Sequence, residues 1–244
     1  MFAFNLPVAG LLKGIASSDL TGQLVIVVQV ALSVWALQIF LSKRMQLASV
    51  RKAIVRFNKD FFPSNDVLNC YLQRKPGRKV AISLMYERTC ERMVRLLAPD
   101  VRNQVISTSS AAQNVALTSS EVQILRGVCE HAEEDECIWL EKSMSTLAGI
   151  VTTAPMLGLL GTVWGVMNAF DLLGGKGTVL LSEIAPAISS ALATTVVGLI
   201  VAIPAAIGYN HLTERLRSIE TDMSGFREEL LGRICNEYRG GDRQ

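Results

Sequence analysis

Hydroxylated side chains lie inside two long apolar stretches of this sequence. Thr162 lies within residues 147–170, and Thr195 lies within residues 184–209. A hydroxyl group both donates and accepts hydrogen bonds, so a series of hydroxyls can relay a proton. Hydroxyls do not hold a charge near neutral pH, and neither stretch contains Asp, Glu, Lys, Arg or His. A proton-driven device built from them therefore needs an ionisable group from a second polypeptide.

Small residues accompany these hydroxyls at helical spacing. In the first of the two stretches, one side of a helix would carry Ala154, Gly158, Gly161, Thr162, Gly165 and Ala169. In the second, small or hydroxylated residues recur every four positions at Pro186, Ser190, Thr194, Gly198 and Ala202, and Thr195 lies beside that row. The spacing therefore predicts that each stretch forms a helix with a narrow polar side, made of these small and hydroxylated residues.

Two interpretations of this polar side remain open from spacing alone. Small residues let helix backbones approach closely in a membrane, and hydroxyls often bond to the carbonyl four residues back. The polar side is then a packing surface formed by Gly158, Gly161, Gly165, Gly198, Pro155 and Pro186. The functional interpretation is a proton path lined by Thr162, Thr195, Ser190 and Thr194.

Three apolar stretches are long enough to cross a membrane, namely residues 24–42, 147–170 and 184–209. A helix needs about 20 such residues to span about 30 Å of hydrocarbon. Hydrophobic residues make up 50% of the chain, and its mean hydropathy is +0.32. Polar side chains in lipid usually face a neighbouring helix, which concerns Gln23, Gln29, Ser33 and Gln38 around the first stretch. We expect an all-α polytopic membrane protein with three transmembrane helices.

The positive charges set the expected orientation. Sixteen Lys and Arg residues lie between the first and second stretches, whereas only Lys13 precedes the first and only Lys176 separates the second from the third. Lys and Arg remain preferentially on the cytoplasmic side. The expected order is an external segment 1–23, the first span, a cytoplasmic region 43–146, the second span, a periplasmic loop 171–183, the third span and a cytoplasmic helix 210–244. A cleaved signal peptide fits less well, because the charge follows the first apolar run and no small-x-small cleavage site ends it.

The last two spans are expected to extend into a cytoplasmic helical bundle. Thr118 and Glu121 have the spacing of a capping box, and from there to Phe170 only Pro155 interrupts the helical pattern. This predicts one helix of about 50 residues, about 75 Å long. After the third span, apolar residues recur every three or four positions, at Leu212, Leu216, Ile219, Met223, Phe226 and Leu230. The acidic run 133–136 is interpreted as a solvated face of this bundle.

Other function classes find little support in the sequence. A net charge of +2 gives no argument for nucleic acid binding. Cys129, His131 and Cys137 match no zinc spacing, and the five cysteines contain no C-x-x-C pair. Residues 174–178 resemble a phosphate-binding loop, but Gly follows the Lys where Ser or Thr is required. No catalytic triad, metal site or cofactor is expected, so the chain is not interpreted as an enzyme.

Two segments of the sequence resemble a known family. Residues 153–170 (TAPMLGLLGTVWGVMNAF) and 184–210 (IAPAISSALATTVVGLIVAIPAAIGYN) are similar to the second and third spans of the TolQ/ExbB family of energy-transducing proton-channel subunits. The similarity is dense over residues 146–212, and the span number and orientation also agree. Trp35 and residues 57–61 look more like TolQ members of the family than ExbB members.

The resemblance implies an assembly and a mechanism. Family members form a homopentamer in the bacterial inner membrane around a dimeric TolR- or ExbD-like single-span subunit, which supplies a membrane aspartate. Proton flow is coupled to a TolA- or TonB-like protein that acts on the outer membrane. The pore-facing threonines of the family fall on Thr162 and Thr195. Many relatives have a glutamate where this chain has Ser190, so the role of that carboxylate is absent here or taken by a partner.

Three other interpretations are compared with a TolQ-like subunit. An ExbB-like subunit would energise TonB-dependent uptake, whereas a TolQ-like subunit would serve outer-membrane integrity and cell division. A flagellar-type stator subunit would be expected to have four spans and a larger cytoplasmic domain, so the three expected spans argue against it. A membrane scaffold without a transport role would tolerate valine in place of Thr162 and Thr195.

Overall fold

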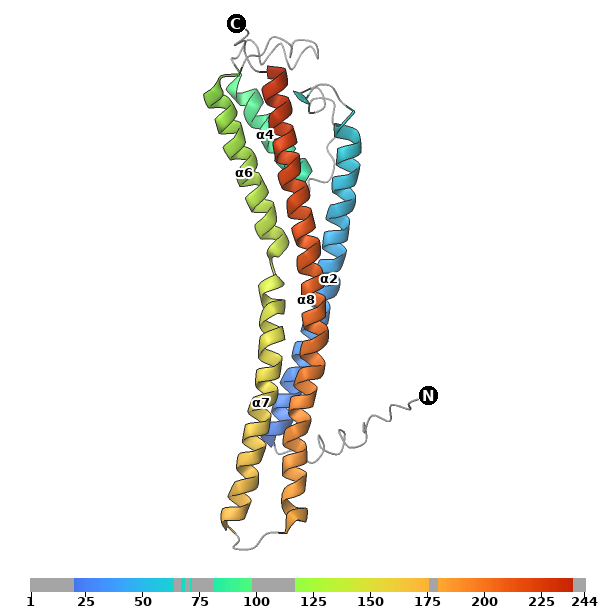
Figure 1. Ribbon diagram of the computed structural model, residues 1–244, viewed down its shortest axis with the longest axis vertical. Coiled ribbons are helices and arrows are strands. Elements are labelled where there is room, and N and C mark those ends of the chain that lie inside the picture. The colour runs from blue at the N-terminus through green and yellow to red at the C-terminus, as the bar shows by residue number, and fades with distance from the viewer. Residues whose placement is uncertain are drawn as a thin grey trace, which may run out of the picture. The chain divides into compact units, whose positions relative to one another are not determined.

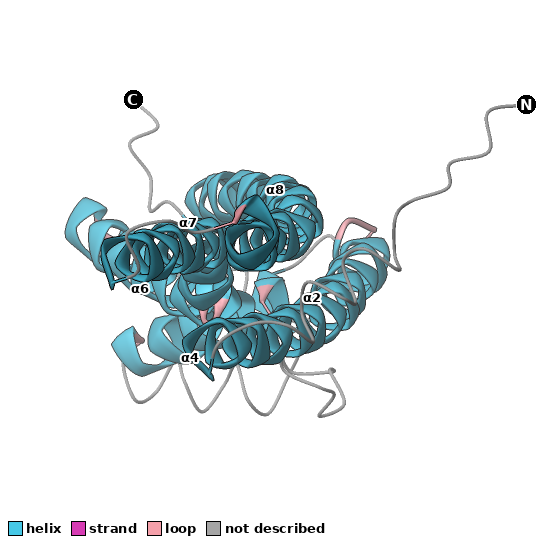
Figure 2. Ribbon diagram, turned by 90° about the horizontal axis from the view of Figure 1, so that it is seen from below, coloured by secondary structure: helices cyan, strands magenta, loops and turns pink. Residues whose placement is uncertain are grey.

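The computed structural model describes residues 20–63, 67–68, 71, 81–97, 117–175 and 180–238, and the elements among them are all α-helices (Figure 1; Figure 2). They are α2 (Leu20–Phe61), α4 (Ile82–Leu96), α6 (Ser119–Glu141), α7 (Met144–Gly175) and α8 (Leu181–Tyr238). The chain forms two compact units, the first from residues 1–44 and 143–213 and the second from residues 45–142 and 214–244. The expected all-α fold class is therefore confirmed.

Three helical stretches in the described part of the chain are long and apolar enough to cross a membrane. They are α2, α8 and Ser119–Gly174, which holds α6 and α7. Large apolar side chains of the first unit remain exposed on these helices, among them Leu159 and Val163 on α7 and Leu199 on α8. A helix that faces lipid presents such a surface, because hydrocarbon does not penalise exposed apolar side chains. The three expected spans are confirmed as helices.

The single helix expected after Thr118 is instead the pair α6 and α7. They are separated by Lys142, whose ψ is 132°, and by Ser143, whose φ is 73°. A positive φ cannot continue a right-handed helix of L-residues. The prediction of a helix interrupted only by Pro155 was therefore wrong, since Pro155 lies inside α7 and the break comes before it.

The first and third spans both extend well beyond their apolar segments. α2 continues without a break to Phe61, an extension that was expected only of the second and third spans. α8 continues to Tyr238, and the apolar residues predicted along it are all buried, namely Leu212, Leu216, Ile219, Met223, Phe226 and Leu230. The predicted amphipathic continuation of α8 is thus confirmed.

Aromatic rings form the centre of the second unit. The ring centroid of Phe61 lies 5.5 Å from that of Tyr86 and 5.2 Å from that of Phe226. The Phe57 centroid lies 5.4 Å from both of these partners. Such aromatic pairs stabilise a fold by about 1 kcal/mol each beyond the burial of area. Because the rings come from α2, α4 and α8, the cluster joins helices that are distant in the sequence.

The predicted capping box is present at the start of α6. The Glu121 N–H donates to Thr118 Oγ1 (3.4 Å), and the Thr118 N–H donates to Glu121 Oε2 (2.8 Å). The hydrogen bonds from Thr118 lower the pKa of the Glu121 carboxyl. The cap fixes where α6 begins.

The acidic run 133–136 makes contacts inside the second unit. Glu133 of α6 accepts a hydrogen bond from Arg227 of α8 (2.5 Å), and their side chains are 12% and 21% exposed. Glu136 accepts a hydrogen bond from the backbone N–H of Ala81 (3.0 Å). Burial raises the pKa of Glu133, and the charge of Arg227 opposes this shift. The interpretation of a solvated face was therefore wrong for Glu133.

Replacing Arg227 by Met should destabilise the second unit, because Glu133 would keep its burial and lose its partner. We expect a loss of about 1–3 kcal/mol in the free energy of unfolding at neutral pH. The unpaired carboxyl would have a folded-state pKa still further above its unfolded value. The loss should therefore shrink as the pH falls through that raised pKa, where the buried carboxyl becomes neutral.

Thermal unfolding of the detergent-solubilised protein between about pH 5 and pH 8 measures this effect. Arg126→Met is the matched control, because Arg126 is half exposed and lies 3.7 Å from Glu228. Exposed ion pairs contribute less than about 1 kcal/mol. Equal losses in the two variants would contradict the prediction.

Candidate functional site between the second and third spans

Glycines bring α7 and α8 close together in the first unit. A Cβ atom on Gly158 would lie 2.9 Å from Thr195 Cα, and one on Gly198 would lie 2.7 Å from Ala154 O. Real Cβ atoms essentially never come so close to backbone atoms, so these positions have room only for glycine. The same helices meet where Gly161 lies against the Thr194 side chain and Gly165 against Ala191. This close approach places polar groups of the two helices within hydrogen-bond reach.

Thr162 of α7 and Thr195 of α8 face each other, and their hydroxyls are hydrogen-bonded to one another. Thr195 Oγ1 also lies 2.9 Å from Gly158 O, while Thr162 Oγ1 lies 3.2 Å from Gly158 O and 3.3 Å from Ala191 O. Each hydroxyl has one proton and more than one acceptor within reach, so either threonine can act as the donor of the pair. Both residues are half-buried. The pair can therefore pass a proton in either direction.

Thr194 and Ser190, the other residues predicted for a proton path, are more deeply buried. Thr194 is 1% exposed, and its hydroxyl donates to Ala191 O (2.7 Å) with Gly158 O at 3.3 Å. Ser190 is 7% exposed and lies about one helical turn before Thr194. The structure thus brings the three predicted threonines around one carbonyl, that of Gly158. The participation of Thr162, Thr195, Thr194 and Ser190 in proton transfer stays a prediction.

The two prolines predicted for helix packing lie inside their helices. Pro155 is half-buried in α7, and Pro186 is exposed in α8. Neither proline ends its helix. Their part in helix packing stays a prediction.

A glutamine from the first span reaches the contact between α7 and α8. Gln29 of α2 is fully buried, and its Nε2 lies 3.2 Å from Thr194 O and 3.5 Å from Ala154 O. The expectation that polar side chains of this span face neighbouring helices is confirmed for Gln29, whereas Gln23 and Gln38 are exposed. Spacing could not single out Gln29, because Gln23 and Gln38 fall on other sides of the helix from Gln29 and Ser33.

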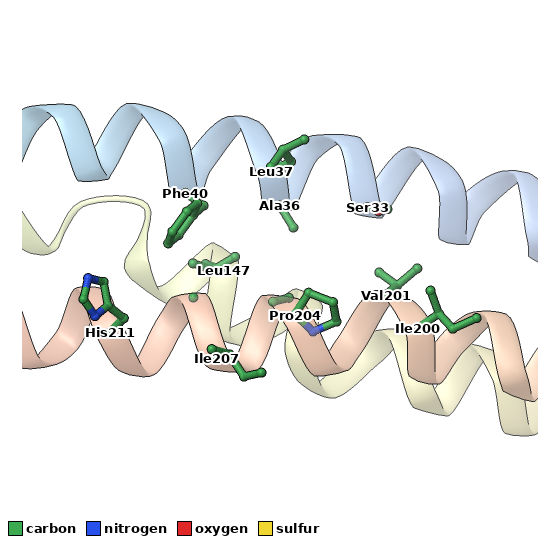
Figure 3. A pocket seen from close by; sticks show the side chains of 12 residues that line it. Ser33, Ala36, Leu37, Phe40, Leu147, Ile200, Val201, Pro204, Ile207 and His211 are labelled. Atoms are coloured by element: carbon green, nitrogen blue, oxygen red, sulfur yellow. The ribbon is translucent and has the colours of Figure 1, made fainter. Parts of the chain in front are cut away.

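An apolar cavity of about 520 Å³ lies between α2 and α8 in the first unit (Figure 3). Ser33 and Phe40 of α2, Leu147 of α7 and Pro204 of α8 contribute to its lining. Among the described residues that line it, His211 is the one ionisable residue. None of the residues predicted for the proton path lines the cavity, namely Thr162, Thr195, Ser190 and Thr194. The cavity is therefore separate from the threonine pair.

Comparisons with known proteins find relatives along most of the chain. Residues 100–225 match the model of the MotA/TolQ/ExbB proton channel family. The Tol-Pal system protein TolQ of Haemophilus influenzae is 30% identical over 213 residues, which cover 85% of this chain and 86% of that protein. TolQ of Pseudomonas aeruginosa is 30% identical over 82% of each chain. The biopolymer transport protein ExbB of Neisseria gonorrhoeae is 38% identical over 94 residues, which cover 38% of this chain and 43% of that protein.

Replacing Gly198 by Ala should weaken the contact between α7 and α8. The new Cβ would meet Ala154 O at 2.7 Å and Gln29 Nε2 at 2.9 Å, so the helices would have to separate. Overpacking of this kind costs about 1–3 kcal/mol. We expect a lower midpoint of thermal unfolding in detergent.

The control is Gly149→Ala in α7, because a Cβ there meets nothing within 4 Å among the described residues. Alanine also favours helix more than glycine does. We expect this variant to unfold at the same temperature as the wild type or higher. A similar fall in both variants would show that crowding is not the cause.

Proposed function

Because the chain belongs to the MotA/TolQ/ExbB proton channel family and has three helices that can span a membrane, we propose that it is a subunit of a bacterial inner-membrane complex driven by the proton motive force. The observation that carries the proposal is the hydrogen-bonded pair of Thr162 and Thr195. Each threonine lies within an apolar segment that contains no Asp, Glu, Lys, Arg or His. The pair can relay a proton, but the group that binds the proton must belong to another polypeptide.

In this proposal, five copies of the chain surround the transmembrane helices of a dimeric TolR- or ExbD-like subunit that carries a membrane aspartate. The threonine hydroxyls suit such a partner, because they donate to an ionised carboxylate and accept from a protonated one. Proton flow drives movement of one component within the other, and the work passes to a TolA- or TonB-like protein. The chain itself catalyses no covalent reaction.

The proposed orientation places the N-terminus in the periplasm and the C-terminus in the cytoplasm. It is supported by the Lys and Arg residues, of which sixteen lie between the first two spans and six follow the third. Residues 43–146 and 210–244 are then cytoplasmic, and residues 171–183 connect the second and third spans on the periplasmic side.

The cellular role that we propose is TolQ-like, in outer-membrane integrity and cell division. The support is the extent of the two TolQ alignments, which cover 85% and 82% of this chain, against 38% for the N. gonorrhoeae ExbB alignment. An ExbB-like role in TonB-dependent uptake is the second candidate, favoured by the 38% identity within that shorter alignment. A non-conducting scaffold differs from both, because it needs no hydroxyls between the spans.

Thr195→Val tests the proton path. Valine keeps the shape of threonine and removes the hydroxyl that bonds to Thr162 and Gly158 O. We expect proton flux through the reconstituted complex to fall about 100-fold or more. In a strain that depends on this protein, we expect Thr195→Val to cause the same outer-membrane defect as deletion of the gene. The variant itself should be expressed and assembled normally.

The matched control is Thr153→Val, which removes an exposed hydroxyl of α7 that donates to Gly149 O of the same helix (2.8 Å). We expect this variant to conduct protons as the wild type does. Wild-type flux in Thr195→Val would refute the proton path and favour the scaffold.

The purified chain without its partner should not carry protons, because its second and third spans hold no Asp, Glu, Lys, Arg or His. The measurement is dye-detected proton uptake into vesicles under an imposed potential. We expect uptake only when the single-span partner is present, and none when the partner's membrane aspartate is replaced by asparagine. Rapid uptake by the chain alone would contradict the proposal.

A further inference from the structure

Gln29 is a polar side chain buried without any exposed surface inside the first apolar span. Its amide nitrogen lies 3.2 Å from Thr194 O of α8 and 3.5 Å from Ala154 O of α7. One side chain of α2 thereby contacts the backbones of both other spans. A polar group in such surroundings is costly unless its hydrogen-bonding capacity is used.

The structure leaves room for this amide at two glycines. A Cβ on Gly198 would lie 2.9 Å from Gln29 Nε2, and a Cβ on Gly158 would lie 3.4 Å from it. The same point at Gly158 is 2.9 Å from Thr195 Cα. The amide of Gln29 therefore lies next to the backbone at Thr195. Its nitrogen donates to the carbonyl oxygen of Thr194, the preceding residue.

The other end of the amide is not used by the described residues. Gln29 Oε1 is buried and has no hydrogen-bond partner among them. Turning the amide round would place its oxygen against two carbonyl oxygens, so the present orientation is the favourable one. Buried acceptors of this kind are normally satisfied by an internal water molecule.

We propose that Gln29 is a positioning residue of the proton path, and that its Oε1 holds a water molecule where α2, α7 and α8 meet. This inference rests on the proposed function. By binding Thr194 O, the amide fixes the rotation of α8 about its axis, and hence the direction in which the Thr195 hydroxyl points. The water supplies a further donor and acceptor beside the threonine pair.

The test uses the complex with its single-span partner in proteoliposomes. Gln29→Leu keeps the approximate size of the side chain and removes both donor and acceptor. We expect about tenfold lower proton flux, with normal assembly by native mass spectrometry. The matched control is Gln38→Leu, since Gln38 is an exposed glutamine of the same helix, and its flux should equal that of the wild type.

Gln29→Glu tests whether the proton flux depends on pH, which it would not do through this side chain if Gln29 only filled space. A protonated glutamate still donates to one carbonyl and keeps an acceptor oxygen, whereas an ionised one is repelled by Thr194 O and Ala154 O. We expect its flux, relative to the wild type, to be higher at about pH 5.5 than at about pH 9.5, because burial and the two carbonyl oxygens raise the pKa of this carboxyl above the ordinary glutamate value. A ratio independent of pH would overturn the inference, and it decides the matter if Gln29→Leu fails to assemble.

Thr195→Val, measured in parallel, separates this inference from the proposed function. If Thr195→Val stops proton flux while Gln29→Leu conducts normally, Gln29 has no part in the path although the proposed function stands. If both conduct normally, the proposed function fails and the inference fails with it. A map of the complex that resolves ordered waters should show one within hydrogen-bond distance of Oε1, and its absence would overturn the water site.

Discussion

The close approach of α7 and α8 is the constraint on which the site depends. At Gly158 and Gly198 the two backbones are so near that a single methyl group would not fit. Hydrocarbon offers no hydrogen bonds, so polar groups of the spans must satisfy one another. Only at this separation can hydroxyls from both helices reach one carbonyl, that of Gly158. The small residues and the threonines therefore meet in one contact, so the same pattern suits both helix packing and the proposed proton path.

The charges of the molecule are distributed in keeping with this arrangement. The apolar segments of α7 and α8 contain none, whereas the second unit uses ion pairs such as Arg227 with Glu133 to join its helices. A fixed charge near the threonine pair would hold a passing proton or repel it. Neutral hydroxyls avoid both outcomes, which suits the proposed path, in which the titrating group belongs to another polypeptide.

The sequence predicted those features that repeat along a helix. The three spans, the buried stripe of α8 from Leu212 to Leu230 and the capping box at Thr118 follow from spacing alone. The break at Ser143 did not, because a serine with positive φ carries no glycine or asparagine signature. Nor could spacing show which of two adjacent threonines meets Thr162. Both lie near the same side of the helix, and only the depth of packing buries Thr194 and leaves Thr195 half-buried.

The shared hydrogen bond between Thr162 and Thr195 has two polarities, since either oxygen can be the donor. When a proton enters at one hydroxyl and leaves from the other, the bond ends with its direction reversed. A second proton can follow the same route only after both C–O bonds have rotated back. During that rotation the Thr162 hydroxyl keeps a hydrogen-bond acceptor, because Gly158 O and Ala191 O both lie within its reach. In the proposed proton path, each transfer must therefore be followed by a rotation of both hydroxyls before the next transfer.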